Sequence, residues 1–434
     1  MNLEYFIARR VASSSKQSFS KLIIRIAIIA IALSLSVMII ATAVISGFKH
    51  QIGEKIFGFW GHVHITSTSV QRSLVEAYPV NIHQDFYPWL DTIGSVSYVD
   101  NVRFLGVEFK NRQVERRTKG GIKHIQVFAL KPGIIKTKDQ IEGIILKGIG
   151  TDFKWSFFED YMVEGEKLSL SDSTASEGIL LSRQTADRLN LGIGDKFIFH
   201  FVENGEPLKR RFTVQGIYKT GLEEYDRKFA LVDIRKIQDI LKWTKDEVGG
   251  FEVFIDDLRD LDMLTEYIYV EELPGDLYAE SIRDKFPAIF EWLALQDINE
   301  VVILLLMLLV GIINMVTALM ILILERMNMI GTLKALGYGN WGIRKIFLYH
   351  AAYIISIGLF WGNFIGIGLC LLQDHFGLIT LSEENYYLSV APVELNVLAI
   401  LALNIGTLIL TLLFLIIPSY LVTRISPLKA IRFE

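Results

Sequence analysis

Two small groups of polar residues have the types and spacing that metal binding requires. His62 and His64 are separated by one residue, so in a strand they point to the same face, and imidazole is a common zinc ligand. Glu223, Glu224 and Asp226 form an acidic group that suits either a cation site or a solvated loop. No third ligand stands at a readable spacing from the histidines. The sequence therefore favours non-metal roles for both groups, with a metal site as the alternative.

Signatures of catalysis are missing from the sequence. It contains no phosphate-binding G-x-x-x-x-G-K-[ST] loop, no H-E-x-x-H helix and no G-x-S-x-G turn. Cys370 is the single cysteine, which excludes an intramolecular disulfide and a cysteine-based zinc site. A net charge of −4 gives no basic patch for nucleic acid. We predict a non-catalytic chain that binds no cofactor and no nucleic acid.

Four long stretches without Asp, Glu, Lys or Arg dominate the composition: residues 26–48, 301–324, 346–373 and 395–423. Of the 434 residues, 51% are hydrophobic, and each stretch exceeds the ~20 residues that span a bilayer. Their one ionisable residue is His350, which disfavours transport coupled to protons or sodium. Small and polar residues within the stretches are predicted to pack helices together. These are Gly311, Gly362, Gly366, Gly406, Asn314, Asn363 and Asn404.

The distribution of Lys and Arg predicts the topology. Twelve of them lie in the segments 9–25, 326–345 and 424–432, whereas the loop 374–394 has four acidic residues and no basic one. Because positive charge stays on the cytoplasmic side, both termini are predicted to be cytoplasmic. The predicted order is an amphipathic segment (1–21), helix 1 (22–48), an external domain (49–297), helix 2 (298–324), a cytoplasmic helix and loop (325–345), helix 3 (346–373), an external loop (374–394), helix 4 (395–423) and a tail (424–434).

The external domain has the alternating pattern of a folded α+β domain. Residues 196–202 and 211–218 predict strands with a turn at 203–205, and residues 183–191 and 257–269 predict helices. The domain has 32 basic and 40 acidic residues, so most of the negative charge of the chain lies here. The predicted fold class is an α-helical membrane protein with four transmembrane helices and a large α+β domain between helices 1 and 2.

The loop between the second and third spans predicts a short amphipathic helix. Met329, Ile330, Leu333 and Leu336 recur at helical spacing, and Gly337 is well placed to end the helix. Such a helix can insert into a groove on a partner and convey its movement to the membrane. It can equally lie on the membrane surface, and the residues alone leave both interpretations open.

The segment ERMNMIGTLKALGYGNWGIRKIF (325–347) resembles the cytoplasmic coupling segment of FtsX-like and MacB-like ABC-transporter permeases. The C-terminal segment 418–434, with its Ser-Pro and final Arg-Phe-Glu, is similar to the end of the same family. FIARR (6–10), SGF (46–48), GILLSRQTADRLNLGIGDKF (178–197) and RRFTVQGIYKTGLEEYD (210–226) are similar to the lipoprotein-releasing, or Lol-type, permeases. The resemblance covers nearly the whole chain.

The resemblance implies a MacB-like periplasmic domain of two parts, a membrane-proximal α/β part (49–150 and 251–297) and an inserted β-rich part (151–250). It implies an inner-membrane permease that pairs with a second permease, as a homodimer or heterodimer, and recruits two P-loop ATPase subunits that bind ATP and Mg. Their closure would drive a lipoprotein from the outer leaflet of the membrane lipids to a soluble periplasmic carrier.

The same resemblance implies three sets of site residues. The ATPase-coupling residues are Glu325, Arg326, Met329, Ile330, Gly331, Leu333, Lys334, Ala335, Leu336 and Gly337. The residues expected to contact acyl chains are Val44, Phe48, Ile52, Ile298, Val301 and Leu305. The carrier-contact residues are Asn204, Gly205, Glu206 and Pro207, although the hairpin that they form is shorter than the carrier-binding hairpin of the family. The chain is therefore expected to bind the carrier itself or to receive the lipoprotein for a partner that does.

Three alternatives remain. A MacB-like exporter of peptides or antibiotics commonly has its ATPase fused to the permease, and this chain does not. An FtsX-like signalling permease, which controls periplasmic cell-wall hydrolases, usually has a much smaller external domain. A membrane receptor outside the ABC class would have no use for the coupling segment. Lipoprotein release is the function that the sequence favours.

Overall fold

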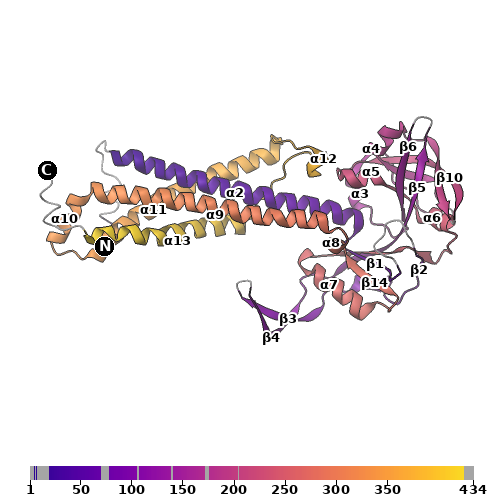
Figure 1. Cartoon of the computed structure of the whole chain (residues 1–434), viewed down its shortest axis with the longest axis horizontal. Coiled ribbons are helices and arrows are strands. Elements are labelled where there is room, and N and C mark those ends of the chain that lie inside the picture. The colour runs from indigo at the N-terminus through magenta and orange to yellow at the C-terminus, as the bar shows by residue number, and fades with distance from the viewer. Residues whose placement is uncertain are drawn as a thin grey trace. The chain divides into compact units, whose positions relative to one another are not determined.

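The computed structural model describes residues 4, 6, 19–69, 78–104, 107–137, 140–171, 175–203 and 205–424 (Figure 1). The chain forms two compact units. The helical unit comprises Met1–His50, Trp292–Thr380 and Val390–Glu434, and the α/β unit comprises Gln51–Glu291 and Leu381–Ser389. Most of the predicted amphipathic segment 1–21 and nearly all of the tail 424–434 lie outside the described residues.

Among the described residues, four helices are long and apolar enough to cross a membrane, which confirms the four predicted spans. They are α2 (Phe19–Trp60), α9 (Pro287–Glu325), α11 (Asn340–Phe376) and α13 (Val397–Ser419). Two of them extend well past the charge-free stretches. Helix α2 continues for 12 residues beyond Phe48, and α9 begins 11 residues before residue 298. The last turns of α2 and the first turn of α9 therefore belong to the α/β unit.

Glycines bring α2 and α11 into close contact. Gly358, Gly362 and Gly366 recur every four residues and so lie on one face of α11. A Cβ atom at Gly362 would lie 2.9 Å from the Leu35 Cβ, and one at Gly358 would lie 2.8 Å from the Ile31 Cβ. The missing side chains let the two backbones approach, as in other membrane helix pairs. The predicted packing role of Gly362 and Gly366 is confirmed.

The asparagines and the other glycines of the spans have mixed roles. Asn363 on α11 and Asn404 on α13 exchange two side-chain hydrogen bonds, of 2.7 and 3.0 Å, and so join these helices. Asn314 donates to the Val310 carbonyl of its own helix. No heavy atom lies within 4 Å of a Cβ built at Gly406, so the predicted packing contact of this glycine is wrong in the described structure.

The α/β unit is built on one mixed sheet of ten strands, in the order β14-β1-β13-β5-β6-β11-β8-β10-β7, with β9 paired to both β10 and β5. The pairs β6–β11 and β8–β10 are parallel and the other pairs are antiparallel. The strands are β1 (Val63–Ser67), β5 (Ile122–Lys136), β6 (Ile141–Ile149), β7 (Met162–Gly165), β8 (Gly178–Ser182), β9 (Lys196–Glu203), β10 (Glu206–Tyr218), β11 (Phe229–Asp233), β13 (Gly250–Ile255) and β14 (Leu277–Ser281). The sheet runs through both predicted parts of the domain.

Two small sheets and several short helices complete the unit. The sheets pair β2 (Val80–Asn81) with β12 (Glu247–Val248), and β3 (Ser97–Phe104) with β4 (Val107–Arg117). The helices are α3 (Ser156–Tyr161), α4 (Arg183–Leu189), α5 (Glu223–Lys228), α6 (Ile234–Leu241), α7 (Leu261–Tyr267), α8 (Ile282–Lys285) and α12 (Glu383–Tyr386). The strands predicted at 196–202 and 211–218 and the helix predicted at 183–191 are confirmed. The helix predicted at 257–269 is broken into a 3₁₀ turn, α7 and a π turn.

The acidic group 223–226 is not a solvated loop. It forms the first turn of α5, and Asp226 is buried. The Asp226 carboxylate accepts hydrogen bonds from the Thr220 hydroxyl (2.7 Å) and from the Gly221 backbone N–H (3.1 Å). Asp226 therefore stabilises the turn that precedes α5, and the expectation of a solvated loop is corrected.

The contact between α2 and α11 yields a prediction about stability. Gly362→Leu places a branched side chain where the Leu35 Cβ lies 2.9 Å away, and overpacking of this kind costs about 1–3 kcal/mol. We expect a lower midpoint of thermal unfolding in detergent. Gly368→Leu is the matched control, because no heavy atom lies within 4 Å of a Cβ at Gly368 on the same helix. Equal midpoints for the two variants would contradict the packing role.

Candidate coupling and substrate surfaces

The predicted amphipathic helix is present as α10 (Met327–Ala335). Ile330 is fully buried in the core of the helical unit, and Met329 and Leu333 pack against that core. The helix ends where Gly337 adopts a φ of +86°, and its N–H donates to the Lys334 carbonyl. The predicted helix and its terminating glycine are both confirmed, and Met329, Ile330 and Leu333 of the predicted apolar stripe pack into the core of the same unit, whereas Leu336 does not.

Basic side chains tie this segment to the C-terminal end of α13. The Lys334 ammonium donates to the carbonyls of Val422 (2.8 Å) and Thr423 (3.2 Å) in the short helix α14 (Leu421–Arg424). Arg344, from α11, donates to the Ser419 hydroxyl (3.1 Å) and to the Ile416 carbonyl (3.2 Å). Cations favour the carbonyl end of a helix, where backbone oxygens have no helical partner. These hydrogen bonds therefore join α10 to α14 and the start of α11 to the end of α13.

The face of α10 away from this core is exposed. Leu336 is 79% exposed and Ala335 is exposed beside it, whereas Ile330 and Gly331 are buried. A leucine this accessible at the end of an otherwise packed helix is suited to a partner's groove. The predicted coupling residues thus divide into an inner set that packs against the core of the unit and an exposed outer set that includes Ala335 and Leu336.

Residues predicted to contact acyl chains lie mostly where α2 and α9 pass each other. The two helices are joined by a hydrogen bond from the Thr42 hydroxyl to Glu300 (2.8 Å) and by the Lys49–Asp297 ion pair (2.6 Å). Ile298, Val301 and Leu305 lie on α9, and each is more than half exposed. Val44 and Phe48 on α2 are half-buried. An exposed apolar stripe thus lies on α9 next to these polar contacts.

Ile52 departs from that prediction. It is fully buried in the α/β unit, because α2 does not end at Phe48 but continues into that unit. A side chain with no exposed surface cannot contact an acyl chain. We therefore remove Ile52 from the candidate surface.

The residues predicted to contact a carrier form the end of the β9–β10 hairpin. Glu203 pairs with Glu206, which leaves a two-residue loop, and Gly205 has a φ of +80°. Asn-Gly is the preferred sequence for such a loop, although Asn204 itself lies outside the described residues. Glu206 and Pro207 are exposed. In the described residues, the two strands remain paired up to Glu203 and Glu206, so the hairpin is short.

The two histidines have structural partners. His62 accepts a hydrogen bond at Nδ1 from the Ile255 N–H (3.1 Å), and His64 donates from Nε2 to the Trp60 carbonyl (2.8 Å). Within the described ranges, no group of three His, Cys, Asp or Glu side chains is placed to hold a metal ion. The alternative of a metal site at His62 and His64 therefore has no support in this part of the chain.

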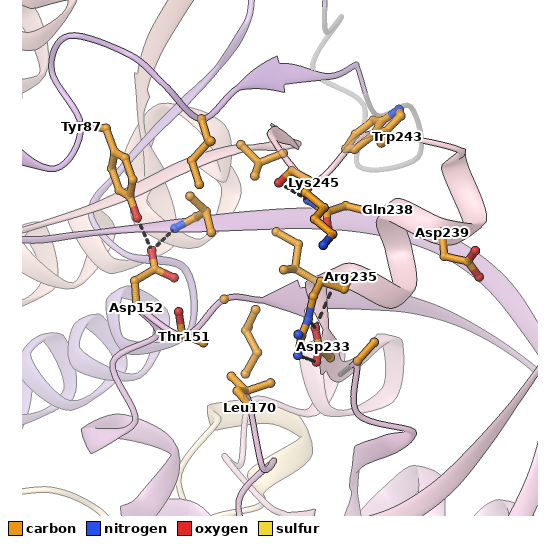
Figure 2. A pocket seen from close by; sticks show the side chains of 17 residues that line it. Tyr87, Thr151, Asp152, Leu170, Asp233, Arg235, Gln238, Asp239, Trp243 and Lys245 are labelled. Atoms are coloured by element: carbon orange, nitrogen blue, oxygen red, sulfur yellow. Dashed lines mark hydrogen bonds and ion pairs between the residues drawn. The ribbon is translucent and has the colours of Figure 1, made fainter. Parts of the chain in front are cut away.

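A polar crevice of about 510 Å³ lies at the carboxyl ends of the parallel strands β6 and β11 (Figure 2). Its polar side chains are bonded mainly to one another. The Tyr87 hydroxyl donates to Asp152 (3.1 Å), and the Arg235 guanidinium donates to Asp233 (2.5 Å). Burial raises the pKa of Asp152, and the hydrogen bonds that it accepts oppose this rise. We assign this crevice no function.

Two models of known families match the chain, one over the first membrane helix and most of the α/β unit and the other over the later membrane helices. The model for the MacB-like periplasmic core domain matches residues 26–270, more than half of the chain, and the model for the FtsX-like permease C-terminal region matches residues 301–427. The chain belongs to this MacB-like and FtsX-like permease family. The α/β unit is the MacB-like periplasmic core domain, and the whole chain is a multi-pass inner-membrane protein.

Several curated relatives match over the full length. The lipoprotein-releasing system transmembrane protein LolC of Xylella fastidiosa (strain 9a5c) is 21% identical over 100% of this chain and 98% of its own length. LolC of Neisseria meningitidis serogroup B is 21% identical over 100% of both chains, and LolE of Haemophilus influenzae is 22% identical over 99% of both. Among solved structures, the extracellular domain of the noncanonic ABC-type transporter YknZ from Gram-positive bacteria has a TM-score of 0.27 at 13% identity, covering 37% of this chain and 81% of that one, which is too weak a likeness to bear on the argument.

The buried histidine His62 yields a prediction of pH dependence. Burial lowers the pKa of His62 from 6.5 to about 4, and the positive charges of Lys154 and Lys123 contribute to this fall to a lesser extent. Between these values the unfolded chain binds a proton that the folded chain does not, so stability is present above pH 6.5 and is lost as the pH falls towards 4. The loss is about 1.4 kcal/mol for each pH unit between the two pKa values.

This loss is measurable as protection of the β1 and β13 amides against hydrogen exchange, in the full chain in detergent at pH 7 and pH 5. His62→Asn keeps an acceptor for the Ile255 N–H and removes the titration. We expect the variant to lose less protection than the parent chain on acidification. An equal loss in both would contradict the assignment.

Lys334 yields a second prediction. Lys334→Met removes the donor to the Val422 and Thr423 carbonyls, and a hydrogen bond to a charged group is worth about 1.5–3 kcal/mol. We expect roughly tenfold faster amide exchange at the C-terminal end of α13. Lys345→Met is the control, since Lys345 lies near the Trp341 ring instead, at 5.9 Å. Unchanged exchange in Lys334→Met would show that α10 is not attached there.

Proposed function

We propose that this chain is the permease subunit of an ABC transporter that releases lipoproteins from the outer leaflet of the inner membrane to a periplasmic carrier. ATP is hydrolysed on a separate pair of P-loop ATPase subunits, which hold the Mg. The observation that supports this most directly is similarity over 98–100% of both chains to relatives named as lipoprotein-releasing system transmembrane proteins. The absence of a phosphate-binding loop from the sequence agrees with a separate ATPase.

The proposed orientation places both termini and α10 in the cytoplasm and the MacB-like domain in the periplasm. The asymmetry of Lys and Arg beside the spans supports it. In this orientation α10 faces the compartment that holds ATP. The ends of α2 and α9 that are joined by Lys49 and Asp297 lie at the outer leaflet.

The proposed route of the force begins at α10. An ATPase groove accepts Leu336, and its closure displaces α10, whose inner side is held to the other helices through Ile330 and Lys334. Because the helices are packed through glycines and paired asparagines, they move as bodies and do not bend locally. The outer ends of the same helices therefore move together with α10.

The proposed substrate surface is the exposed stripe Ile298, Val301 and Leu305 on α9, with Val44 and Phe48 of α2 beside it. Acyl chains bind such a surface by burial of apolar area alone. Lipoprotein release starts and ends outside the cytoplasm, so it needs no polar channel through the bilayer. The lack of Asp, Glu, Lys and Arg in the stretches 26–48, 301–324, 346–373 and 395–423 agrees with this.

A second permease completes the proposed assembly, as a second copy of this chain or as a related partner. The tight β9–β10 turn, at Gly205, Glu206 and Pro207, offers little for docking a carrier. In a heterodimer the partner would hold the carrier, and this chain would receive the lipoprotein.

The coupling role is tested with Leu336→Asp in a reconstituted complex of permease and ATPase. A charge at this 79% exposed position disfavours insertion into an apolar groove. We expect ATP hydrolysis to continue while release of a triacylated lipoprotein falls by about tenfold, the ratio that ~1.4 kcal/mol of lost coupling gives. Leu258→Asp is the control, because it adds the same charge at an exposed leucine of the α/β unit.

Lipoprotein release at the parental rate by Leu336→Asp would contradict the coupling role of Leu336. ATP hydrolysis by the parent complex without any lipoprotein release, together with activation of a cell-wall hydrolase, would replace the proposed function by the signalling alternative. Export of peptides or antibiotics by the parent complex would favour the efflux alternative.

A further inference from the structure

The end of α2 is enclosed by a buried ionic cluster in the α/β unit. The side chains of Lys147, on β6, and Glu252, on β13, are 0% exposed, and their Nζ and Oε1 atoms lie 2.7 Å apart. The Lys147 ammonium also donates to the Phe59 carbonyl and lies 4.9 Å from the centre of the Trp60 ring. His64 donates from Nε2 to the Trp60 carbonyl. The cluster therefore binds the backbone of the last turn of the helix.

The carbonyls at this helix end would otherwise have no partner. Gly61, with a φ of +74°, donates its N–H to the Phe57 carbonyl, and Lys147 and His64 serve the carbonyls of Phe59 and Trp60. A buried carbonyl without a donor is costly, and a cation at this end also meets the negative pole of the helix. The cluster thus caps two carbonyls of this helix end, with donors from strands β6 and β1.

A second connection leads from the same cluster to α9. Strand β1, which follows α2, pairs along its whole length with β14, which precedes α8 and α9. Lys285, the last residue of α8, donates to His64 Nδ1 (2.8 Å), and α9 begins at Pro287. The His64 imidazole on β1 therefore contacts both helices: it donates to the Trp60 carbonyl at the end of α2, and it accepts from Lys285, which lies two residues before the start of α9.

The protonation states agree with this arrangement. Burial, reinforced by Lys285, lowers the pKa of His64 to about 4, so the ring is neutral with its proton on Nε2. Burial alone would raise the pKa of Glu252, but Lys147 and His64 outweigh it and hold that pKa below its ordinary value. Burial lowers the pKa of Lys147, and the neighbouring Glu252 opposes that fall. The 2.7 Å contact between Lys147 and Glu252 makes them an ion pair, and Glu252 Oε2 also accepts a hydrogen bond from the Gln126 side chain.

Stability alone is a poor reason for such a pair. Replacing a buried ion pair by apolar side chains of similar volume is often neutral or stabilising, because both charges must be desolvated. An apolar pair cannot donate a hydrogen bond to the Phe59 carbonyl, as Lys147 does. Directional contacts of this kind fix the position of a helix end, whereas apolar contacts allow it to slide.

We infer that Lys147, together with Glu252, His64 and Lys285, fixes the ends of α2 and α9 to the sheet of the periplasmic domain, so that displacement of the membrane helices moves that domain as one body. These are positioning residues, and none of them is placed on the substrate surface. The inference rests on the proposed function, since it assigns the cluster the last step in the route of the force from α10.

The test uses the full chain in its reconstituted complex with the ATPase. Lys147→Met with Glu252→Leu removes both charges together, which avoids leaving one charge buried alone. We expect a folded complex with unchanged ATP hydrolysis and about tenfold fewer lipoproteins released for each ATP. Lys131→Met is the matched control, because Lys131 pairs with Glu203 in the same sheet and contacts no part of α2 in the described structure.

A spectroscopic readout separates positioning from stability. Spin labels at Gln51 on α2 and Val202 on β9, both exposed, in a Cys370→Ala background, report the distance from the helix to the sheet. We expect one narrow distance distribution in the parent chain during ATP turnover and a broad one in the double variant. A merely structural role would change the midpoint of unfolding and leave the distribution narrow.

The outcomes also separate this inference from the proposed function. Release by a folded double variant at the parental ratio to ATP, with a narrow distribution, overturns the inference and leaves the function standing. A parent complex that releases no lipoprotein overturns the function, and the spin-label distances still decide whether the helix end is fixed. If the double variant does not fold, Lys285→Met, at a half-buried position, decides in its place, with parental release overturning the inference and reduced release supporting it.

Discussion

The structure depends on how α2 ends. A helix that leaves a membrane and continues into a folded domain must find partners for the carbonyls of its last turn, and it must find them in the interior of that domain. Here the donors are Lys147 on β6 and His64 on β1, and Glu252 on β13, a strand between them in the sheet, contacts both side chains. The strands that contact the helix end lie together in the part of the sheet ordered β14-β1-β13-β5-β6. Within this part, β1 directly follows α2, and β14 precedes α8 and α9.

The helical unit must hold its helices together with few charged side chains. The central stretches of its spans, residues 26–48, 301–324, 346–373 and 395–423, have no Asp, Glu, Lys or Arg, so ion pairs cannot join the helices there. Glycines on α11 let α2 approach, Asn363 and Asn404 join α11 to α13, and charged contacts such as Lys49–Asp297 and Lys334 to α14 are confined to the helix ends. A bundle with its directional contacts at both ends and close apolar packing between them is suited to moving as rigid pieces.

Much of this could be predicted from the sequence, because the relevant patterns are local. The four spans, the α10 helix with its Gly337 cap and the strands 196–202 and 211–218 all follow from composition and periodicity. The continuation of α2 to Trp60 could not be predicted from charge, and it is the reason that Ile52 is buried. The ionic cluster is formed by residues far apart in the chain. Its one local signal is a charged residue in the middle of an apolar strand, Lys147 in IILKGI and Glu252 in GFEVFI, and only the pairing of strands shows that the two charges meet.

The central claim is that ATP-driven movement of these helices extracts lipoproteins. It is tested most directly by purifying the chain with its associated subunits in mild detergent, reconstituting the complex in vesicles with a fluorescent triacylated lipoprotein, and measuring the lipoprotein transferred to a soluble acceptor. The account predicts that a P-loop ATPase co-purifies and that transfer requires ATP hydrolysis and stops with a non-hydrolysable analogue. Steady ATP hydrolysis with no lipoprotein leaving the vesicles would contradict it.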